Sequence, residues 1–250
     1  MRGHSLKAAM AALGLLIAAP LSASPDTFID FVEEPIGVSE DHLFLLRVST
    51  DNLGYYEASR VEVYFVQIDW ETGAETTLVV DRFVKSMDYD ENGEAQGYSI
   101  KRDEGLKPRS PYLVMTERGG IPWIAAHRLW KLSAPPVVSD QPDWITVQHG
   151  GSHRISRDAI QDGLEKQKAF FVANIADHPR SSSMTTRQHF EERTISAAQC
   201  ASDGIYDYWV PGRSTLPLLM RVRCAFDDDS EQTSLIVQLR PTPIADFQLP

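Results

Sequence analysis

The sequence predicts a β-rich α+β protein of mainly antiparallel strands, with one principal helix in the C-terminal half. Two observations indicate this fold class. Short segments rich in β-branched and aromatic residues, separated by turn residues, occur in both halves of the chain. Apolar residues recur with helical spacing after Ser156. A hydrophobic fraction of 42%, with five Trp and ten Phe, argues against disorder.

The first 23 residues have the layout of a secretory signal peptide. The basic residues Arg2 and Lys7 precede an apolar run over residues 8–19, and small residues follow it. This run of about 12 residues is too short to span a bilayer, which needs about 20. We expect cleavage after Ala23, with Ser24 as the alternative boundary, and a periplasmic or secreted protein without a membrane span.

Residues 24–132 form the predicted acidic, β-rich region. The expected strands cover residues 42–50, 60–70, 76–84, 82–89, 94–101, 112–116 and 123–130. In the second of these strands, Val61, Val63 and Phe65 alternate with Glu62 and Tyr64, so the two sets lie on opposite faces. Turn sequences at residues 71–74 and 90–93 are expected to close two hairpins, the second through an Asn-Gly pair.

The charge distribution separates the two halves of the chain. The formal net charge is −11, and residues 24–144 carry 22 acidic and 11 basic side chains. An acidic surface repels phosphate backbones and anionic lipid, so we expect no nucleic acid partner. Residues 133–143 contain three Pro and form a predicted connector, which is either a domain boundary or a loop within one domain.

Residues 144–250 form the predicted α+β region. A strand is expected over residues 144–148, and the helix starts after Ser156 as N-cap, with Asp158 in its first turn. Ile160, Leu164 and Phe171 recur at helical spacing, although residues 169–173 could instead form a strand. Further strands are expected over residues 186–195, 216–226 and 232–239.

The two cysteines, Cys200 and Cys224, predict one structural disulfide. An isolated pair in an exported chain is typical of a disulfide, and the C-x-x-C spacing of redox-active pairs is absent. The bond would close a 25-residue loop. Chain entropy gives such a loop a stabilisation of roughly 3.5 kcal/mol.

A calcium-loop pattern occurs at the second hairpin turn. Asp88, Asp90, Asn92 and Gly93 match the first half of D-x-D-x-N-G, and calcium prefers about six to eight oxygen ligands. However, Ser99 stands where the loop needs a bidentate carboxylate. The same residues are typical of a hairpin turn, so we expect a solvated turn here. The alternative is a calcium site in which Asp88, Asp90 and Asn92 are the metal ligands.

The segment from His149 to His153 is the candidate catalytic or metal site. Two His four residues apart on a helix can share a metal ion, but here Gly150 and Gly151 intervene. A catalytic zinc needs at least three protein ligands. We therefore expect a Gly-rich turn with surface histidines, and no metal or cofactor.

These observations favour an exported binding protein over an enzyme. We expect it to bind or assemble with an envelope or extracellular protein or glycan. The alternative is a hydrolase acting on envelope or extracellular material, with His149 and His153 at its site. A flat or edge-strand surface favours binding, whereas a deep polar pocket beside either His favours the hydrolase.

We predict that the protein recovered from the cell envelope or medium begins at Ser24. Signal peptidase removes the charged and apolar leader during export, so the intact mass should equal that of residues 24–250. A recovered species that retains residues 1–19 would contradict this prediction.

Overall fold

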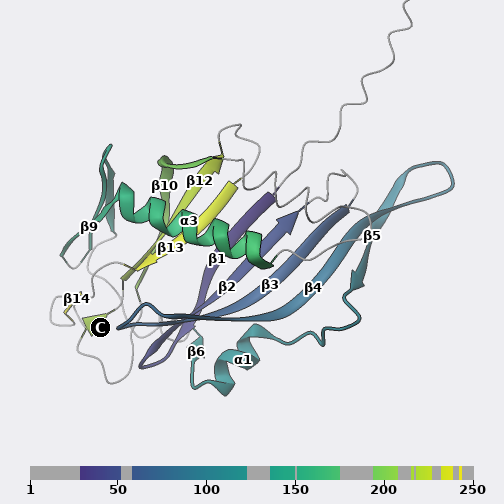
Figure 1. Cartoon of the computed structure of the whole chain (residues 1–250), viewed down its shortest axis with the longest axis horizontal. Helices are drawn as coiled ribbons and strands as arrows, with labels where there is room; N and C mark the ends of the chain where they lie inside the picture. The colour runs from purple at the N-terminus through teal and green to yellow at the C-terminus, as the bar shows by residue number, and fades with distance from the viewer. Residues whose placement is uncertain are drawn as a thin grey trace, which may run out of the picture.

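The computed structural model describes residues 29–51, 58–122, 136–149, 151–174, 194–207, 215–216, 218–226, 232–238 and 242–243 (Figure 1). This part of the chain is strand-rich, with antiparallel sheets and two helices. The fold class predicted from the sequence is therefore confirmed at this level.

One nine-stranded sheet carries the fold, in the order β10-β12-β13-β1-β2-β3-β4-β5, with β6 pairing to β1. Its pairs are antiparallel except for the parallel pair of β1 and β13. Strands from both sides of the Pro-rich connector share this sheet. The strands are β1 (Ile29–Val38), β2 (His42–Asp51), β3 (Ala58–Asp69), β4 (Glu75–Tyr89), β5 (Ala95–Arg102), β6 (Ile121–Pro122), β10 (Ile195–Asp207), β12 (Leu218–Phe226) and β13 (Gln232–Gln238).

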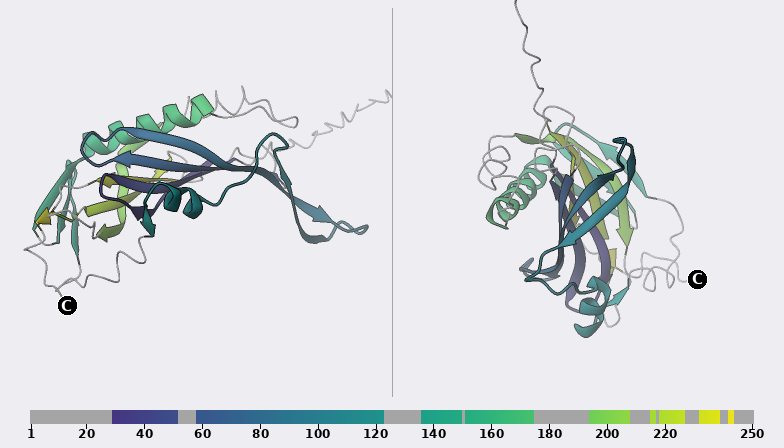
Figure 2. Two further views of the ribbon diagram at one scale, coloured as in Figure 1. Left: turned by 90° about the horizontal axis from the view of Figure 1, so that it is seen from below. Right: turned by 90° about the vertical axis from the view of Figure 1, so that its right-hand side faces the viewer.

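Two small sheets and two helices complete the described part of the chain. A three-stranded sheet has the order β7-β8-β9, and β11 pairs with β14. The helix α3 lies along one face of the large sheet, and α1 lies on the opposite side (Figure 2). The bounds are β7 (Val137–Asp140), β8 (Trp144–Gln148), β9 (Ser152–Ser156), β11 (Thr215–Leu216), β14 (Thr242–Pro243), α1 (Pro111–Glu117) and α3 (Arg157–Asn174).

Both faces of the sheet are covered at β2, which explains its continuous apolar sequence. Leu43 and Leu45 belong to the cluster on the α3 side of the sheet. Phe44 packs on the α1 side with Phe65 and Met115. Alternate residues of a strand point to opposite faces, so the run Leu-Phe-Leu supplies two separate hydrophobic layers.

Most of the expected elements are present. The strands expected over residues 42–50, 60–70, 76–89, 94–101, 144–148, 216–226 and 232–239 correspond to β2, β3, β4, β5, β8, β12 and β13 within a few residues. The helix expected after Ser156 is α3, whose Ala159 N–H donates to Ser156 Oγ at 3.1 Å. Residues 169–173 are helical. The strand expected over residues 123–130 lies outside the described residues. The same holds for residues 186–193 of the strand expected over residues 186–195.

The strand expected over residues 112–116 is wrong, because this segment is the helix α1. A short apolar run does not distinguish a strand from a helix by its periodicity. Pro111 occupies the first turn, where proline favours a helix. Burial decides the outcome, since the consecutive residues Val114 and Met115 both pack beneath Phe44 and Phe65.

The predicted disulfide is confirmed. Cys200 of β10 and Cys224 of β12 are directly opposite each other in the sheet, and their sulfur atoms are bonded. Both side chains are buried in the cluster that includes Ile160 and Leu164 of α3. The bond therefore fixes the edge of the sheet that α3 covers.

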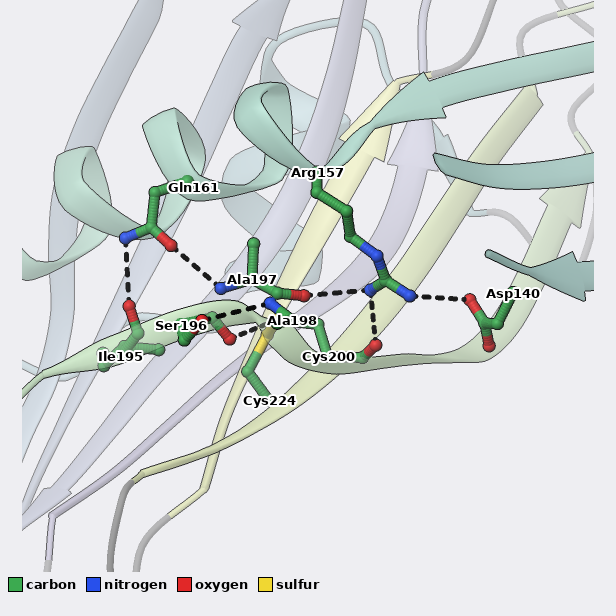
Figure 3. The surroundings of a disulfide bond; sticks show 9 residues. All are labelled: Asp140, Arg157, Gln161, Ile195, Ser196, Ala197, Ala198, Cys200 and Cys224. Carbon is green, nitrogen blue, oxygen red and sulfur yellow. Dashed lines mark hydrogen bonds and ion pairs between the residues drawn. A yellow bond between two sulfur atoms is a disulfide. The ribbon is translucent and has the colours of Figure 1, made fainter. Parts of the chain in front are cut away.

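Two side chains of α3 complete the hydrogen bonding of β10 where its register is irregular (Figure 3). Arg157 Nη1 donates to the carbonyl oxygens of Ala197 at 2.9 Å and of Cys200 at 2.6 Å. Gln161 accepts from the N–H of Ala197 at 2.8 Å and donates to the carbonyl of Ile195 at 3.0 Å. Backbone groups released by the irregularity are thus satisfied by the helix.

We predict that Arg157→Met lowers the free energy of unfolding by about 2 kcal/mol, because carbonyl groups of β10 lose a charged donor. The matched control is Arg109→Met. Arg109 forms an exposed ion pair with Glu117, for which less than about 1 kcal/mol is expected. Urea titration with the disulfide intact measures both changes. Equal losses in the two variants would show that the Arg157 contacts do not anchor β10.

Candidate interaction surface

The hairpin of β4 and β5 projects beyond its neighbouring strand (Figure 2). The pairing of β3 with β4 ends at Ala58 and Ser86, whereas β4 continues to Tyr89. The pairing of β4 with β5 spans Phe83 to Tyr89. We call residues 85–102 the arm, because much of this hairpin lies outside the two-sided packing of the sheet.

The arm carries exposed apolar side chains on one face. The register places Met87 opposite Tyr98 and Lys85 opposite Ile100, and directly paired residues share a face. Tyr98 is 58% exposed and Ile100 is 53% exposed. The Lys85 ammonium lies 3.8 Å from the centre of the Tyr98 ring, which is a cation–π distance. A face of this composition is typical of protein contacts.

The outer edge of β5 is the second feature of the arm. β5 ends the nine-stranded sheet, and no other strand of the described part of the chain pairs with it. All eight of its residues are exposed. An edge strand presents a row of N–H and C=O groups that can pair with another strand. The arm thus combines an accessible strand edge with aromatic side chains.

The tip of the arm contains the residues of the calcium-loop pattern. One carboxylate oxygen of Asp90 accepts the N–H groups of Asn92 and Glu94, both at 2.9 Å. The Glu94 N–H contributes most to lowering the pKa of the Asp90 carboxyl below its usual range. Asp88 accepts from the hydroxyl of Ser99 at 2.9 Å. These carboxylates therefore have roles in the hairpin itself, and the expectation that calcium does not bind stays a prediction.

His149 directly follows β8, and His153 is the second residue of β9, opposite Val147. The prediction of surface histidines is wrong, since their exposed fractions are 6% and 7%. His153 Nε2 lies 3.1 Å from the carbonyl oxygen of His149, and the His149 N–H donates to the Gly151 carbonyl. The segment is a β-hairpin packed into the protein, because alternate residues of β9 are buried. Within the described residues, no three His, Cys, Asp or Glu side chains are arranged to hold a metal ion.

Buried charges under α3 are the feature that sequence analysis missed. Arg47 of β2 lies between Glu33 and Glu75, with its Nε 2.7 Å from Glu33 Oε1 and its Nη2 3.0 Å from Glu75 Oε2. The guanidinium also lies 4.6 Å from the centre of the Phe170 ring of α3. Burial alone lowers the pKa of Arg47, but the two carboxylates raise it well above its ordinary value. The arginine therefore remains charged.

A second group of charges extends from buried residues of β2 and β3 to partly exposed residues at the base of the arm, which is the end that joins the rest of the sheet. Arg60 pairs with Asp51 at 2.8 Å. Glu62 accepts from the Tyr64 hydroxyl and lies 3.0 Å from Arg82, which also pairs with Asp103 at 3.3 Å.

Burial, followed by the negative charge of Glu62, raises the pKa of Tyr64, so the phenol keeps its proton. Because Asp103 follows β5 directly, the ion pairs of Arg82 connect the end of β5 to the interior of the sheet.

The polar face of β3 is more buried than its valine face. Arg60, Glu62 and Tyr64 are buried, whereas Val61 and Val63 are only half-buried. The sequence feature that could have indicated this burial was a set of charged residues within strongly apolar strands. Such charges are buried only when paired, and the pairing depends on neighbouring strands that the sequence does not specify.

No protein-family model, curated protein or solved structure matches this chain. No helix in the described ranges is both long enough and apolar enough to cross a membrane.

We predict that Arg47→Met destabilises the protein by about 3 kcal/mol, because it leaves Glu33 buried without its charged partner. The double variant Glu33→Gln with Arg47→Met should recover part of this loss, since the uncompensated charge is removed. Urea titration of the wild type, both single variants and the double variant completes the cycle. Strictly additive losses would contradict the coupling of Glu33 and Arg47.

Proposed function

We propose that the protein is an exported binding or assembly protein of the cell envelope, without enzymatic activity, and that the arm is its contact surface. One observation carries this proposal: β5 is an edge strand with every residue exposed, on a hairpin that presents Tyr98 and Ile100 to solvent. Natural proteins usually cover such edges. An edge that is left accessible can add a strand of a partner.

The chemistry of the arm favours a polypeptide partner over a glycan. Backbone N–H and C=O groups along an edge complement those of an added strand, and side-chain contacts then provide specificity. Tyr98 offers a large apolar surface with few rotatable bonds, so its ordering on binding costs little entropy. An envelope or extracellular protein is therefore the proposed class of partner.

The arm is held in shape before a partner binds. Arg82 connects Asp103 at the end of β5 to the buried Glu62, and Arg102 lies 3.4 Å from Asp81 of β4. The Asp90 turn fixes the other end of the hairpin. Preorganisation of this kind lowers the entropy lost on association.

The same proposal includes the organisation of the chain. The described strands within residues 24–132 and 144–250 belong to one domain whose principal helix is α3; the pairing of β1 with β13 and the sheet shared by both regions support this. The leader over residues 1–23 directs export, and the Cys200–Cys224 disulfide is compatible with an oxidising compartment.

The hydrolase alternative has less support. It needs a carboxylate or serine beside His149 or His153 in a deep polar pocket. Both rings are buried at the turn of a hairpin, and His153 contacts a backbone carbonyl. The arm offers eight exposed residues along an edge strand, whereas the exposed edge strand β7 has four, so binding through the arm is the function we propose.

Photo-crosslinking in the producing cells tests the proposed function. A photo-crosslinkable amino acid in place of Gln96 in β5 should form a covalent product with a polypeptide, because an added strand would lie against this edge. The matched control places the same group at Lys166, an exposed residue of α3. Tyr98→Ser with Ile100→Ser should abolish the Gln96 product by removing the apolar contacts. Equal products from Gln96 and Lys166, or none from Gln96, would overturn the proposal.

A further inference from the structure

We propose that the arm pairs with the arm of a second copy of this chain, β5 against β5, antiparallel about a two-fold axis at Tyr98. This inference rests on the proposed function and names the partner at the same surface. Its basis is the distribution of charge along the arm. The exposed edge of β5 supplies the backbone groups for such a pair.

The arm is electrically polar along its length. Its tip carries acidic side chains without a basic one, and the end of β5 near the body carries Lys101 and Arg102. The acidic residues of the tip are Asp88, Asp90, Glu91 and Glu94. A partner of one charge would be attracted at one end and repelled at the other. A second copy in antiparallel orientation brings the acidic tip of each arm to the basic end of the other.

The register follows from the same charges. A pair centred on Tyr98 sets Arg102 of each chain opposite Glu94 of the other chain. Of the two adjacent centres, Ser99 would oppose Glu94 with Glu104, and Gly97 would oppose Glu91 with Asp103. Like charges directly opposite each other destabilise a strand pair, so the Tyr98 centre is favoured. Arg102 is available for this contact, since its side chain is 53% exposed even though it lies near Asp81.

The two-fold axis also joins the apolar faces. An axis perpendicular to the sheet keeps the same face of both arms on one side. The exposed side chains of Tyr98 and Ile100, with Met87 beside them, then form one continuous patch from two chains. Pairing closes both edge strands and connects the two sheets through the arms. The net charge of −11 repels two copies at long range, so the local charge match determines whether they associate.

A charge-swap experiment tests the orientation. The tip variant, Glu91→Lys with Glu94→Lys, and the base variant, Lys101→Glu with Arg102→Glu, each oppose like charges in a homodimer. Each should weaken self-association by about tenfold or more in analytical ultracentrifugation. An equimolar mixture should restore the wild-type affinity as a heterodimer, because both ends then match. The tip variant should keep the wild-type unfolding midpoint, since Glu91 and Glu94 are exposed. The base variant loses the Arg102–Asp81 ion pair, so a small fall in its midpoint is expected, and recovery of affinity on mixing separates the charge match from this loss.

Cysteine crosslinking tests the register. Directly opposed residues have Cα atoms about 4.5–5.5 Å apart, which suits a disulfide. Tyr98→Cys should therefore form a disulfide-linked dimer under mild oxidation, whereas Lys166→Cys, an exposed control on the helix α3, should not.

A wild-type protein that stays monomeric at about 100 μM, or charge-swapped variants that do not recover on mixing, would overturn the self-pairing. If Gln96 then still captures a different polypeptide in cells, the proposed binding function stands while its partner is not a second copy. If Gln96 captures nothing, both proposals fail.

Discussion

The positive charge of Arg47 is the constraint on which the centre of the fold depends. A guanidinium between a sheet and a helix needs anionic partners, and Glu33 of β1 and Glu75 of β4 supply them. Glu33 lies on the neighbouring strand β1, whereas Glu75 lies on β4 beyond β3, so the two ion pairs join β1, β2 and β4. The contact of Arg47 with Phe170 then places α3 over the same position. Strand order and helix position are thus linked through one side chain.

The opposite end of α3 is fixed by other means. Arg157 and Gln161 satisfy the irregular backbone of β10, and the Cys200–Cys224 bond joins β10 to β12. An irregular edge strand would otherwise expose unpaired backbone groups, so the helix has a polar as well as an apolar role. The two ends of α3 contact different parts of the sheet, and the helix connects strands from both halves of the sequence.

The arm follows a different physical principle from the body of the protein. Its side chains are largely exposed, so its conformation depends on local hydrogen bonds of Asp90 and on ion pairs at its base. The buried Glu62 connects that base to the charged interior of the sheet. A hairpin whose two ends are held by such contacts, and whose edge is accessible, can dock without refolding. The proposed binding role therefore relies on the same buried charges that stabilise the sheet.

The sequence by itself determined the elements whose signals are local. Strand periodicity, the Asn-Gly turn before β5, the cap of α3 at Ser156 and the disulfide were all predictable.

The tertiary structure decided what depends on neighbours distant in the sequence. Packing beneath Phe44 made residues 111–117 a helix, burial removed His149 from the surface, and strand pairing turned isolated charges into ion pairs. The arm also became visible only at this level, because an edge strand is defined by the strand order, and no local pattern states which strand lacks a neighbour.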